Sequence, residues 1–224
     1  MDDLLPPLTA AEVRVLGSLI EKQITTPDYY PLTLNALTNA CNQLTNRDPV
    51  VAFDENTVIR AIDGLREKRL ATQYAGAESR VAKYKHTLTD ARLLTPAEVA
   101  LLCVLLLRGP QTVGELRTRG ERLFCFDSLP EVEETLAALA ARQPQPLAIK
   151  LPRQPGTKEP RHAHLLSGPV EPPAGPAAPS VEPGPVAIRA EDDRVAKLET
   201  EVTTLRGELD DLRQALADFR KQFE

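Results

Sequence analysis

The chain has 224 residues, of which 42% are hydrophobic and only 4% aromatic, so it can form one or two small domains with aliphatic cores. Its formal net charge of −5 is unevenly divided: residues 1–168 carry 20 basic and 20 acidic side chains, whereas residues 169–224 carry 7 and 12. The larger part is therefore neutral, which excludes the strongly basic composition typical of non-specific nucleic-acid binders.

The cysteines, the apolar runs and the first residues indicate the cellular compartment of the protein. The three cysteines, Cys41, Cys103 and Cys125, lie far apart and form no CxxC pair, which predicts free thiols in a reducing compartment. The longest strongly apolar run, residues 99–107, is much shorter than the roughly 20 residues that a membrane-spanning helix needs. The first residues, Met-Asp-Asp, lack the basic start of a secretion signal. We therefore expect a cytoplasmic protein without a membrane segment.

Two similar helix starts lie in the first 168 residues. Thr9-Ala-Ala-Glu12 and Thr95-Pro-Ala-Glu98 are capping-box signals that lie 86 positions apart. Each opens the same apolar pattern, in which Leu16 of the first copy corresponds to Leu102 of the second. Such repetition predicts a small domain built twice. The predicted domains cover residues 1–92 and 93–168.

Each copy has the predicted element order of a winged helix, which is three helices followed by a two-stranded wing. The first copy is predicted to contain a helix capped by Thr9, a helix over 33–46, a helix capped by Asp54, and strands over 71–74 and 80–88. The predicted core positions of its third helix are Val58, Ile59, Ile62 and Leu65. In the second copy the predicted helices cover 96–108, 113–119 and 130–142, and the wing covers 147–166.

The remainder of the chain has a different composition. Residues 169–188 are rich in Pro, Gly and Ala, which predicts an extended linker. Over residues 189–224 apolar side chains recur at alternating spacings of three and four, which is typical of a coiled coil. Opposite charges such as Glu201 and Arg206 face each other only across a parallel seam, so we expect a parallel homodimer. The seam residues are Val195, Leu198, Val202, Leu205, Leu209, Leu212, Leu216, Phe219 and Phe223. The predicted fold class is thus mainly α with small β wings: two tandem winged-helix domains, a Pro-rich linker and a C-terminal coiled-coil helix.

Three segments carry a resemblance to a known family. Residues 25–49, TTPDYYPLTLNALTNACNQLTNRDP, and residues 106–122, LLRGPQTVGELRTRGER, resemble the YceH family of bacterial proteins, as does LPRQPG at 151–156. Together these segments lie within residues 8–168. The resemblance implies a tandem winged-helix fold in a family without an assigned activity. It therefore supplies no catalytic or ligand-binding residues.

Four asparagines are spaced to fall on one face of the predicted second helix: Asn35, Asn39, Asn42 and Asn46. Asparagine is a poor helix former, and a merely solvated face usually carries Lys, Glu or Gln instead. Two interpretations stay open. The asparagines are either a polar face whose end members cap the helix or bond the Pro-rich stretch between the first two helices, or a hydrogen-bonding surface for a base edge, a phosphate or a partner's backbone.

The third helix and the wing of the first copy carry candidate nucleic-acid contacts. The residues that would contact DNA are Asn56, Arg60, Arg80, Lys83 and Lys85. Asn and Arg on the helix can read adenine and guanine edges, and the wing cations can contact phosphates. Asp63 and Glu67 on the same helix would repel phosphates, so the alternative is a set of ordinary solvated charges.

Other chemistry finds little support. The third helix of the second copy begins with the carboxylates Glu131, Glu133 and Glu134, which argues against its entry into a DNA groove. His162 and His164 lack further ligands at metal-binding spacing, and Cys125 lies between two phenylalanines, which predicts a core position. No Ser-His-Asp order, Gly-rich phosphate loop or HExxH motif is present. We therefore expect no catalysis, metal or cofactor.

Two functional hypotheses remain. In the first, the chain is a homodimeric DNA-associated regulator, in which the coiled coil brings two copies of the first winged helix together. In the second, it is a protein–protein scaffold whose winged helices are connector modules; this rests on the balanced charge, the acidic helix start of the second copy and the asparagines.

Overall fold

The computed structural model describes residues 4–74, 81–153 and 159–170. The predicted coiled-coil seam from Val195 to Phe223 lies outside the described residues, as do nearly all of the predicted linker and the wing residue Arg80. Within the described part the chain is mainly helical, with two small antiparallel sheets.

The first half contains three main helices and a three-stranded sheet. The helices are α1 (Ala10–Thr25), α2 (Leu34–Cys41) and α3 (Glu55–Glu67), with a short 3-10 turn η1 (Pro27–Tyr29) and a short helix α4 (Leu88–Arg92). The strands are β1 (Leu32–Thr33), β2 (Ala71–Tyr74) and β3 (Lys83–His86), and their order in the sheet is β1-β3-β2. β3 therefore pairs with both neighbours, and β1 is a strand that the sequence pattern did not predict.

The second half repeats this order. Its helices are α5 (Pro96–Arg108), α6 (Val113–Gly120) and α7 (Leu129–Ala141), and its strands are β4 (Ala148–Lys150) and β5 (His162–His164). In place of β1, Gln111 forms an isolated antiparallel bridge with His162 immediately before α6. Each half thus consists of three helices followed by an antiparallel strand pair, and in each the chain before the second helix touches that sheet.

Local capping explains where the helices begin. Both predicted capping boxes are confirmed: Thr9 accepts from the backbone of Glu12, Thr95 accepts from the backbone of Glu98, and each glutamate accepts from the cap's own N–H in return. Asp54 caps α3 as predicted, with its carboxylate 2.8 Å from the Thr57 nitrogen. These caps satisfy backbone donors that have no partner inside the helix.

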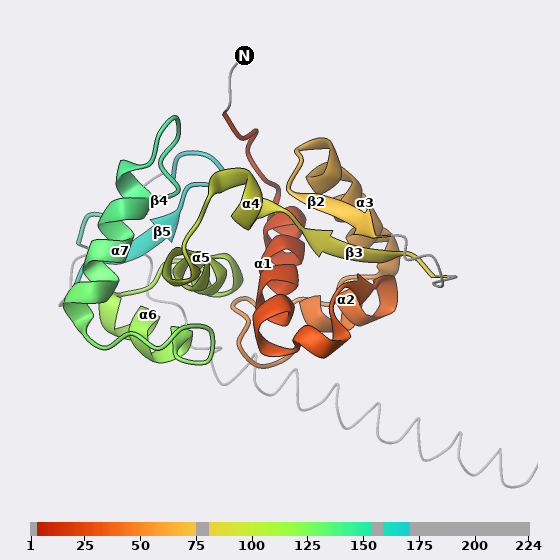
Figure 1. The fold of residues 1–224 in the computed structure, drawn as a ribbon, viewed down its shortest axis with the longest axis horizontal. Coiled ribbons are helices and arrows are strands. Elements are labelled where there is room, and N and C mark those ends of the chain that lie inside the picture. Colours follow the sequence, from red (N-terminus) through yellow and green to blue (C-terminus); the bar gives the residue numbers. More distant parts are fainter. Residues whose placement is uncertain (1–3, 75–80, 154–158, 171–224) are drawn as a thin grey trace, which may run out of the picture. The chain divides into compact units, whose positions relative to one another are not determined.

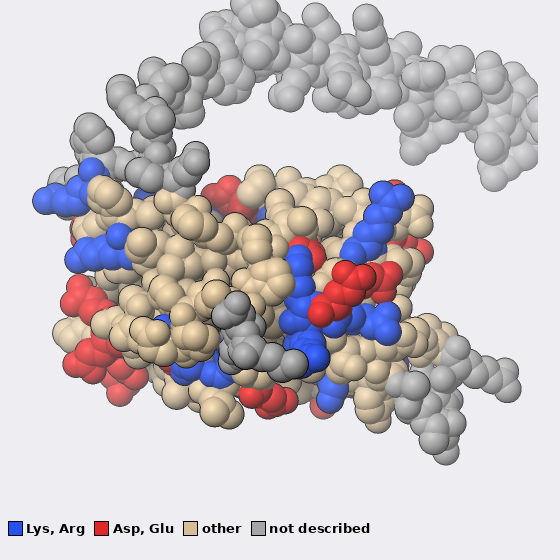
Figure 2. All heavy atoms as spheres, turned by 90° about the horizontal axis from the view of Figure 1, so that it is seen from above, with Lys and Arg blue, Asp and Glu red and all other residues tan. Residues whose placement is uncertain are grey.

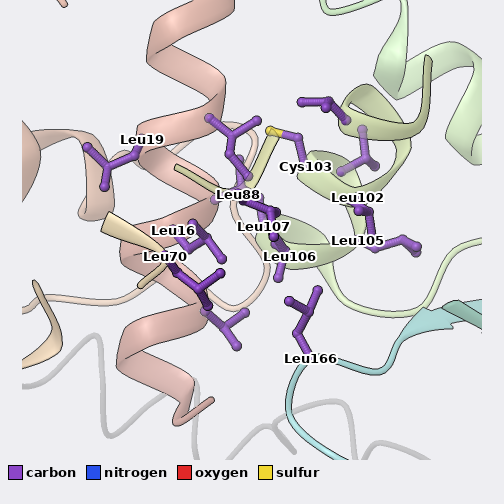
Figure 3. Packing of buried hydrophobic residues seen from close by; sticks show 14 of the residues in the cluster. Leu16, Leu19, Leu70, Leu88, Leu102, Cys103, Leu105, Leu106, Leu107 and Leu166 are labelled. Carbon is purple, nitrogen blue, oxygen red and sulfur yellow. The ribbon is translucent and has the colours of Figure 1, made fainter. Parts of the chain in front are cut away.

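The core joins the two halves. α1 and α5 lie side by side at the centre of the described part (Figure 1), and one hydrophobic cluster runs through both halves. Leu106 and Leu107 of α5 lie toward α1 in the space between the two helices (Figure 3), and both are buried. The low aromatic content predicted this aliphatic packing.

Equivalent positions of the repeat meet where α1 crosses α5. Cys103 lies 86 positions after Gly17, and its sulfur is 3.6 Å from the carbonyl oxygen of Gly17. A Cβ atom on Gly17 would lie 2.8 Å from Cδ2 of Leu107, so the absence of a side chain at position 17 allows this close approach. A contact between a residue and its own equivalent is the pattern of a two-fold related, isologous interface.

The predicted second helix was too long. It covers residues 34–41, not 33–46, because the side chain of Asn42 bonds both backbone groups of Phe53, each at 2.8 Å, and so holds the chain in a turn. Asn46 has a φ of 61°, in the left-handed region that ends regular helix. Leu44, which lies in the part of the predicted helix that does not form, is consequently 80% exposed.

Other differences are smaller. Ile59 of α3 was predicted in the core but is 37% exposed, and Cys125 was also predicted in the core but is exposed. The strand predicted over residues 80–88 ends at His86, because Leu88 begins the short helix α4 and buries its side chain.

Candidate functional site

The four described candidates for DNA contact lie on α3 and β3. Asn56 and Arg60 lie one turn apart on the exposed face of α3, the spacing that places side chains on one side of a helix. Lys83 and Lys85 alternate along β3 with Tyr84 and His86, which pack toward the core. Because successive strand residues point to opposite faces, both lysines project from the outer face of the sheet.

The charges around these residues are mixed. On α3 the carboxylate of Asp63 pairs with Arg66 at 3.0 Å, and Glu55 and Glu67 are exposed near the two ends of the helix. On the face seen in Figure 2, basic and acidic side chains lie beside one another without a broad region of one sign. Basic and acidic side chains, which are equal in number over residues 1–168, are therefore also mixed on this surface.

The asparagines do not share one helix face, since α2 ends before two of them. Asn35 and Asn39 remain on α2, exposed and bonded to each other at 3.2 Å. Asn42 fastens the loop after α2 to Phe53, and the side-chain oxygen of Asn46 accepts a hydrogen bond from Arg108 of the second half. The prediction that all four asparagines lie on one helix face was wrong, because Asn42 and Asn46 lie beyond the end of α2. A binding role of the asparagines stays a prediction.

A buried charge cluster lies where the halves meet. Glu21, in the last turns of α1, has no exposed side-chain surface, and its carboxylate is paired with Arg47, which is equally buried. The guanidinium of Arg47 bonds both carboxylate oxygens and also the carbonyl of Ala40, at 2.8 Å. Arg122, from the second half, donates to the same carboxylate. One buried anion is thus shared by two arginines from different halves.

Three further arginines lie near Arg47 and Arg122. We name the whole set, together with the buried carboxylate of Glu21, the arginine junction: Arg14, Arg47, Arg108, Arg119 and Arg122. Arg14 donates to the carbonyls of Cys41 and Pro49. Arg119 bonds the side-chain oxygen of Gln111 and lies 3.4 Å from the carboxylate of Glu115. The backbone N–H of Asp48 donates to the carbonyl of Leu107 at 2.9 Å, which fastens the loop after α2 to the end of α5.

The junction perturbs the acidity of its members. Burial alone would raise the pKa of Glu21, but the hydrogen bonds and charge of Arg47, together with Arg122, outweigh burial and hold that pKa below its ordinary value. Burial lowers the pKa of Arg108, and the positive charges of Arg119 and Arg122 lower it further. The surroundings of Glu21 therefore stabilise its charged form, whereas neighbouring positive charges disfavour the charged form of Arg108.

A second kind of ion pair occurs once in each half. The capping-box glutamate Glu12 accepts from Lys68 at 2.6 Å, and its equivalent Glu98 accepts from Arg142 at 2.7 Å. Lys68 and Arg142 both lie at the end of the third helix of their half, 74 positions apart. The same carboxylate thus caps the first helix and ties it to the third.

The sequence reading did not single out the arginine junction. A signal was present: at the repeat offset of 86, Glu21 corresponds to Leu107, so a carboxylate stands where the other copy has a core leucine. A charge at such a position requires a buried partner. The identity of that partner depends on the path of the loop after α2, which no periodic pattern describes.

The cysteine, histidine and acidic side chains of the described residues bear on metal binding and catalysis. No group of three or more His, Cys, Asp and Glu side chains there could hold a metal ion. Burial raises the pKa of the Cys41 thiol to about 11 and raises that of Cys103 as well, so neither is a thiolate near neutral pH. His86 and His164 are buried bases whose pKa values burial lowers to about 4.

No helix in the described part of the chain is long and apolar enough to cross a membrane.

These features define a helix-rich protein with small antiparallel sheets and a charged junction between its two halves. The family model described as a protein of unknown function, DUF480, matches residues 8–157. A UPF0502 protein of Geotalea uraniireducens is 56% identical over 97% of this chain and 98% of its own length, and one of Geobacter sulfurreducens is 54% identical over the same shares. A UPF0502 protein of Opitutus terrae is 63% identical over 75% of this chain and 74% of its own length. The chain belongs to this uncharacterised bacterial family, as the resemblance in its sequence indicated.

Proposed function

We propose that the chain is a DNA-associated regulator built from two tandem winged helices, which acts as a homodimer and has no reaction centre. The element order of each half supports the winged-helix assignment, since three helices followed by an antiparallel strand pair is the order of that fold. In DNA-binding winged helices the third helix enters the major groove, and here that helix is α3.

The observation that carries the proposal is the pairing of two polar surfaces in the first half. The exposed face of α3 offers Asn56 and Arg60, whose side chains match the hydrogen-bonding edges of adenine and guanine. The outer face of β3 offers Lys83 and Lys85, which can contact phosphates. The cross-strand partners of these lysines on β2 are Tyr74 and Thr72, which add further hydrogen-bonding groups to the same face.

Dimerisation is the second part of the proposal. The heptad residues from Val195 to Phe223 would form a parallel two-stranded coiled coil. The relatives from Geotalea and Geobacter match 97% of this chain, so the match includes most of this segment. Pairing doubles the contact set and offsets the weak affinity expected of a neutral domain, because the second half-site is bound at high effective concentration. Deletion of residues 189–224 should convert a dimer to a monomer in sedimentation, and an unchanged mass would refute the dimer.

A salt titration of the full chain with mixed-sequence duplex DNA tests the main claim. Wild-type protein should bind at low salt, with an affinity that falls steeply as salt rises. Arg60→Ala and Lys83→Ala should each weaken binding about tenfold, because each removes a charge-assisted contact. Lys150→Ala, the loss of an exposed lysine on β4 of the second half, is the matched control and should change the affinity less. Absence of binding at low salt would eliminate the proposal.

A second candidate function is a protein–protein scaffold, favoured by the surface of α7. This third helix of the second half exposes Glu133 and Glu134, followed by Ala137 and Ala138, where a DNA reader would present cations. A helix face with small side chains and two carboxylates suits contact with a basic protein surface. The same titration separates the two functions, since the scaffold requires no affinity for duplex DNA at any salt concentration.

A further inference from the structure

The arginine junction brings together two segments that are distant in the chain. The loop after α2 supplies Asn46, Arg47 and Asp48, and the end of α5 with the following residues supplies Arg108, Arg119 and Arg122. Direct bonds join the two segments, from Asp48 to Leu107 and from Arg108 to Asn46. These segments are parts of the two longest stretches that carry the family resemblance, 25–49 and 106–122.

Positive charge exceeds negative charge at this place. Among the described residues, the carboxylates that act on the five arginines are Glu21, Asp48 and Glu115. Glu21 is shared by Arg47 and Arg122, and Glu115 is shared by Arg119 and Arg161. Within the described residues Arg108 is paired with no carboxylate and donates only to the amide oxygen of Asn46. Several guanidinium N–H groups therefore lack an anionic acceptor.

Arg108, Arg119 and Arg122 are partly accessible to solvent, and each is held in position by hydrogen bonds to the protein. The side chains of Arg119 and Arg122 are 34% and 40% exposed, and Arg108 is half-buried. Arg122 is fixed by the buried carboxylate of Glu21, while Arg119 is fixed by Gln111 and Glu115. The guanidinium of Arg108 donates to the side-chain oxygen of Asn46. The three guanidinium groups are thus pre-organised, which lowers the entropy lost when a ligand binds.

Like charges already oppose one another here. The pKa of Arg108 is lowered first by burial and then by Arg119, Arg122 and Arg47, with Asp48 acting in the opposite direction. An added anion would relieve this repulsion and supply acceptors for the free N–H groups.

We propose that Arg108, Arg119 and Arg122 form a binding site for a phosphate group at the exposed edge of the arginine junction. The planar guanidinium fork matches the spacing of phosphate oxygens, and three forks suit a doubly charged phosphate better than a single carboxylate. The phosphate belongs either to a small phosphorylated ligand or to a DNA backbone. The site is separate from α3 and β3, so it does not depend on the proposed DNA contacts.

The first test uses pyrophosphate as the probe and the full chain as the protein. Calorimetric titration should show saturable binding that exceeds the effect of chloride at matched ionic strength. Arg108→Gln and Arg119→Gln should each weaken binding about tenfold or more, since each removes charge-assisted hydrogen bonds. No saturable binding by the wild type, or unchanged affinity in both variants, would overturn the site.

The matched control is Arg117→Gln, on the same helix as Arg119. Arg117 is an exposed arginine of α6, and it donates to the backbone carbonyls of Phe126 and Asp127 instead of the junction. Its loss changes net charge by the same amount and should leave pyrophosphate affinity within about twofold of wild type. An equal loss in this variant would mean that the chain binds anions by net charge alone, which contradicts a defined site.

A second arm assigns the source of the phosphate. If the site holds a DNA backbone, pyrophosphate should compete with duplex DNA and Arg108→Gln should weaken duplex binding. If it holds a small phosphorylated ligand, pyrophosphate should bind while Arg108→Gln leaves duplex binding unchanged. Arg60→Ala should not alter pyrophosphate affinity in either case, so failure of the α3 surface is distinguishable from failure of this site.

Discussion

The helices α1 and α5 occupy equivalent places in the two halves, yet they differ at the position nearest the junction. In α5 that position is Leu107, which is buried in the hydrophobic cluster. In α1 it is Glu21, which is equally buried but carries a charge and is held by arginines from both halves. The comparison teaches that one carboxylate makes the two central helices unequal at an otherwise equivalent buried position. That carboxylate holds Arg122, which is one of the three cations of the proposed phosphate site.

The largest expected effect comes from making the two helices alike at this position. Glu21→Leu should lower the free energy of unfolding by about 3–5 kcal/mol, because it leaves Arg47 buried without its carboxylate. The double variant Glu21→Leu with Arg47→Met should recover most of that loss, since no uncompensated charge then remains buried. Urea unfolding of both variants measures the difference. A double variant no more stable than the single one would show that the pair is not the cause.

The second prediction concerns a feature that the halves share. His86 of β3 pairs with Ala71, and His164 of β5 pairs with Ala148, in equivalent places of the two sheets. In both, the ring nitrogen Nδ1 is buried and has no hydrogen-bond partner in the part of the chain that the structure describes. A proton added there would be buried without an acceptor, which agrees with the lowering of both pKa values to about 4 by burial.

Stability should therefore fall as the pH decreases from about 6.5 to about 4. In that window the unfolded chain binds protons at these histidines and the folded chain does not, and for His86 the loss is on the order of 3 kcal/mol. Above pH 6.5 both states are neutral at these positions, so the contribution is constant. Urea unfolding at pH 7 and pH 4.5 should show a smaller loss in His86→Gln and in His164→Gln than in wild type. Identical losses in all three proteins would contradict the prediction.

The smallest expected effect tests the crossing of α1 and α5. Gly17→Ala should destabilise the protein by about 1 kcal/mol, because the new Cβ lies 2.8 Å from Leu107 and the overpacking outweighs the gain in helix propensity. Gly114→Ala in α6 is the matched control, since no atom lies within 4 Å of a Cβ there. It should leave stability unchanged or raise it by a few tenths of a kcal/mol. Equal effects of the two substitutions in thermal unfolding would argue against close packing at Gly17.

Much of the fold could be predicted from the sequence because its signals are local and occur twice. The capping boxes of Thr9 and Thr95 and the apolar periodicity behind them define α1 and α5 closely. The second helix was overextended because side chains such as Asn42 bond a loop that is distant in the pattern. The strand β1 was missed because two residues are too few to show an alternation.

The candidate site could be predicted only in part. The positions of Asn56, Arg60, Lys83 and Lys85 on an exposed helix and a strand follow from periodicity, and the structure has them on α3 and β3; their role as a site stays a prediction. The arginine junction was not found, because its members come from α1, from the loop after α2 and from the stretch between the end of α5 and Arg122, and they meet only through the packing of the halves. Alignment of the two copies shows that Glu21 stands at the position of the core residue Leu107, which indicates a buried charge. Only the three-dimensional structure shows which arginines pair with it.

The shared cluster between α1 and α5 has a consequence for how the chain unfolds. Separation of the halves would expose the leucines of both central helices to water at once, and it would strip Glu21 of the cation supplied by Arg122. Neither half can lose its structure while the other keeps a complete core. Residues 8–168 should consequently melt in one cooperative step, in which the duplicated units behave thermodynamically as a single one.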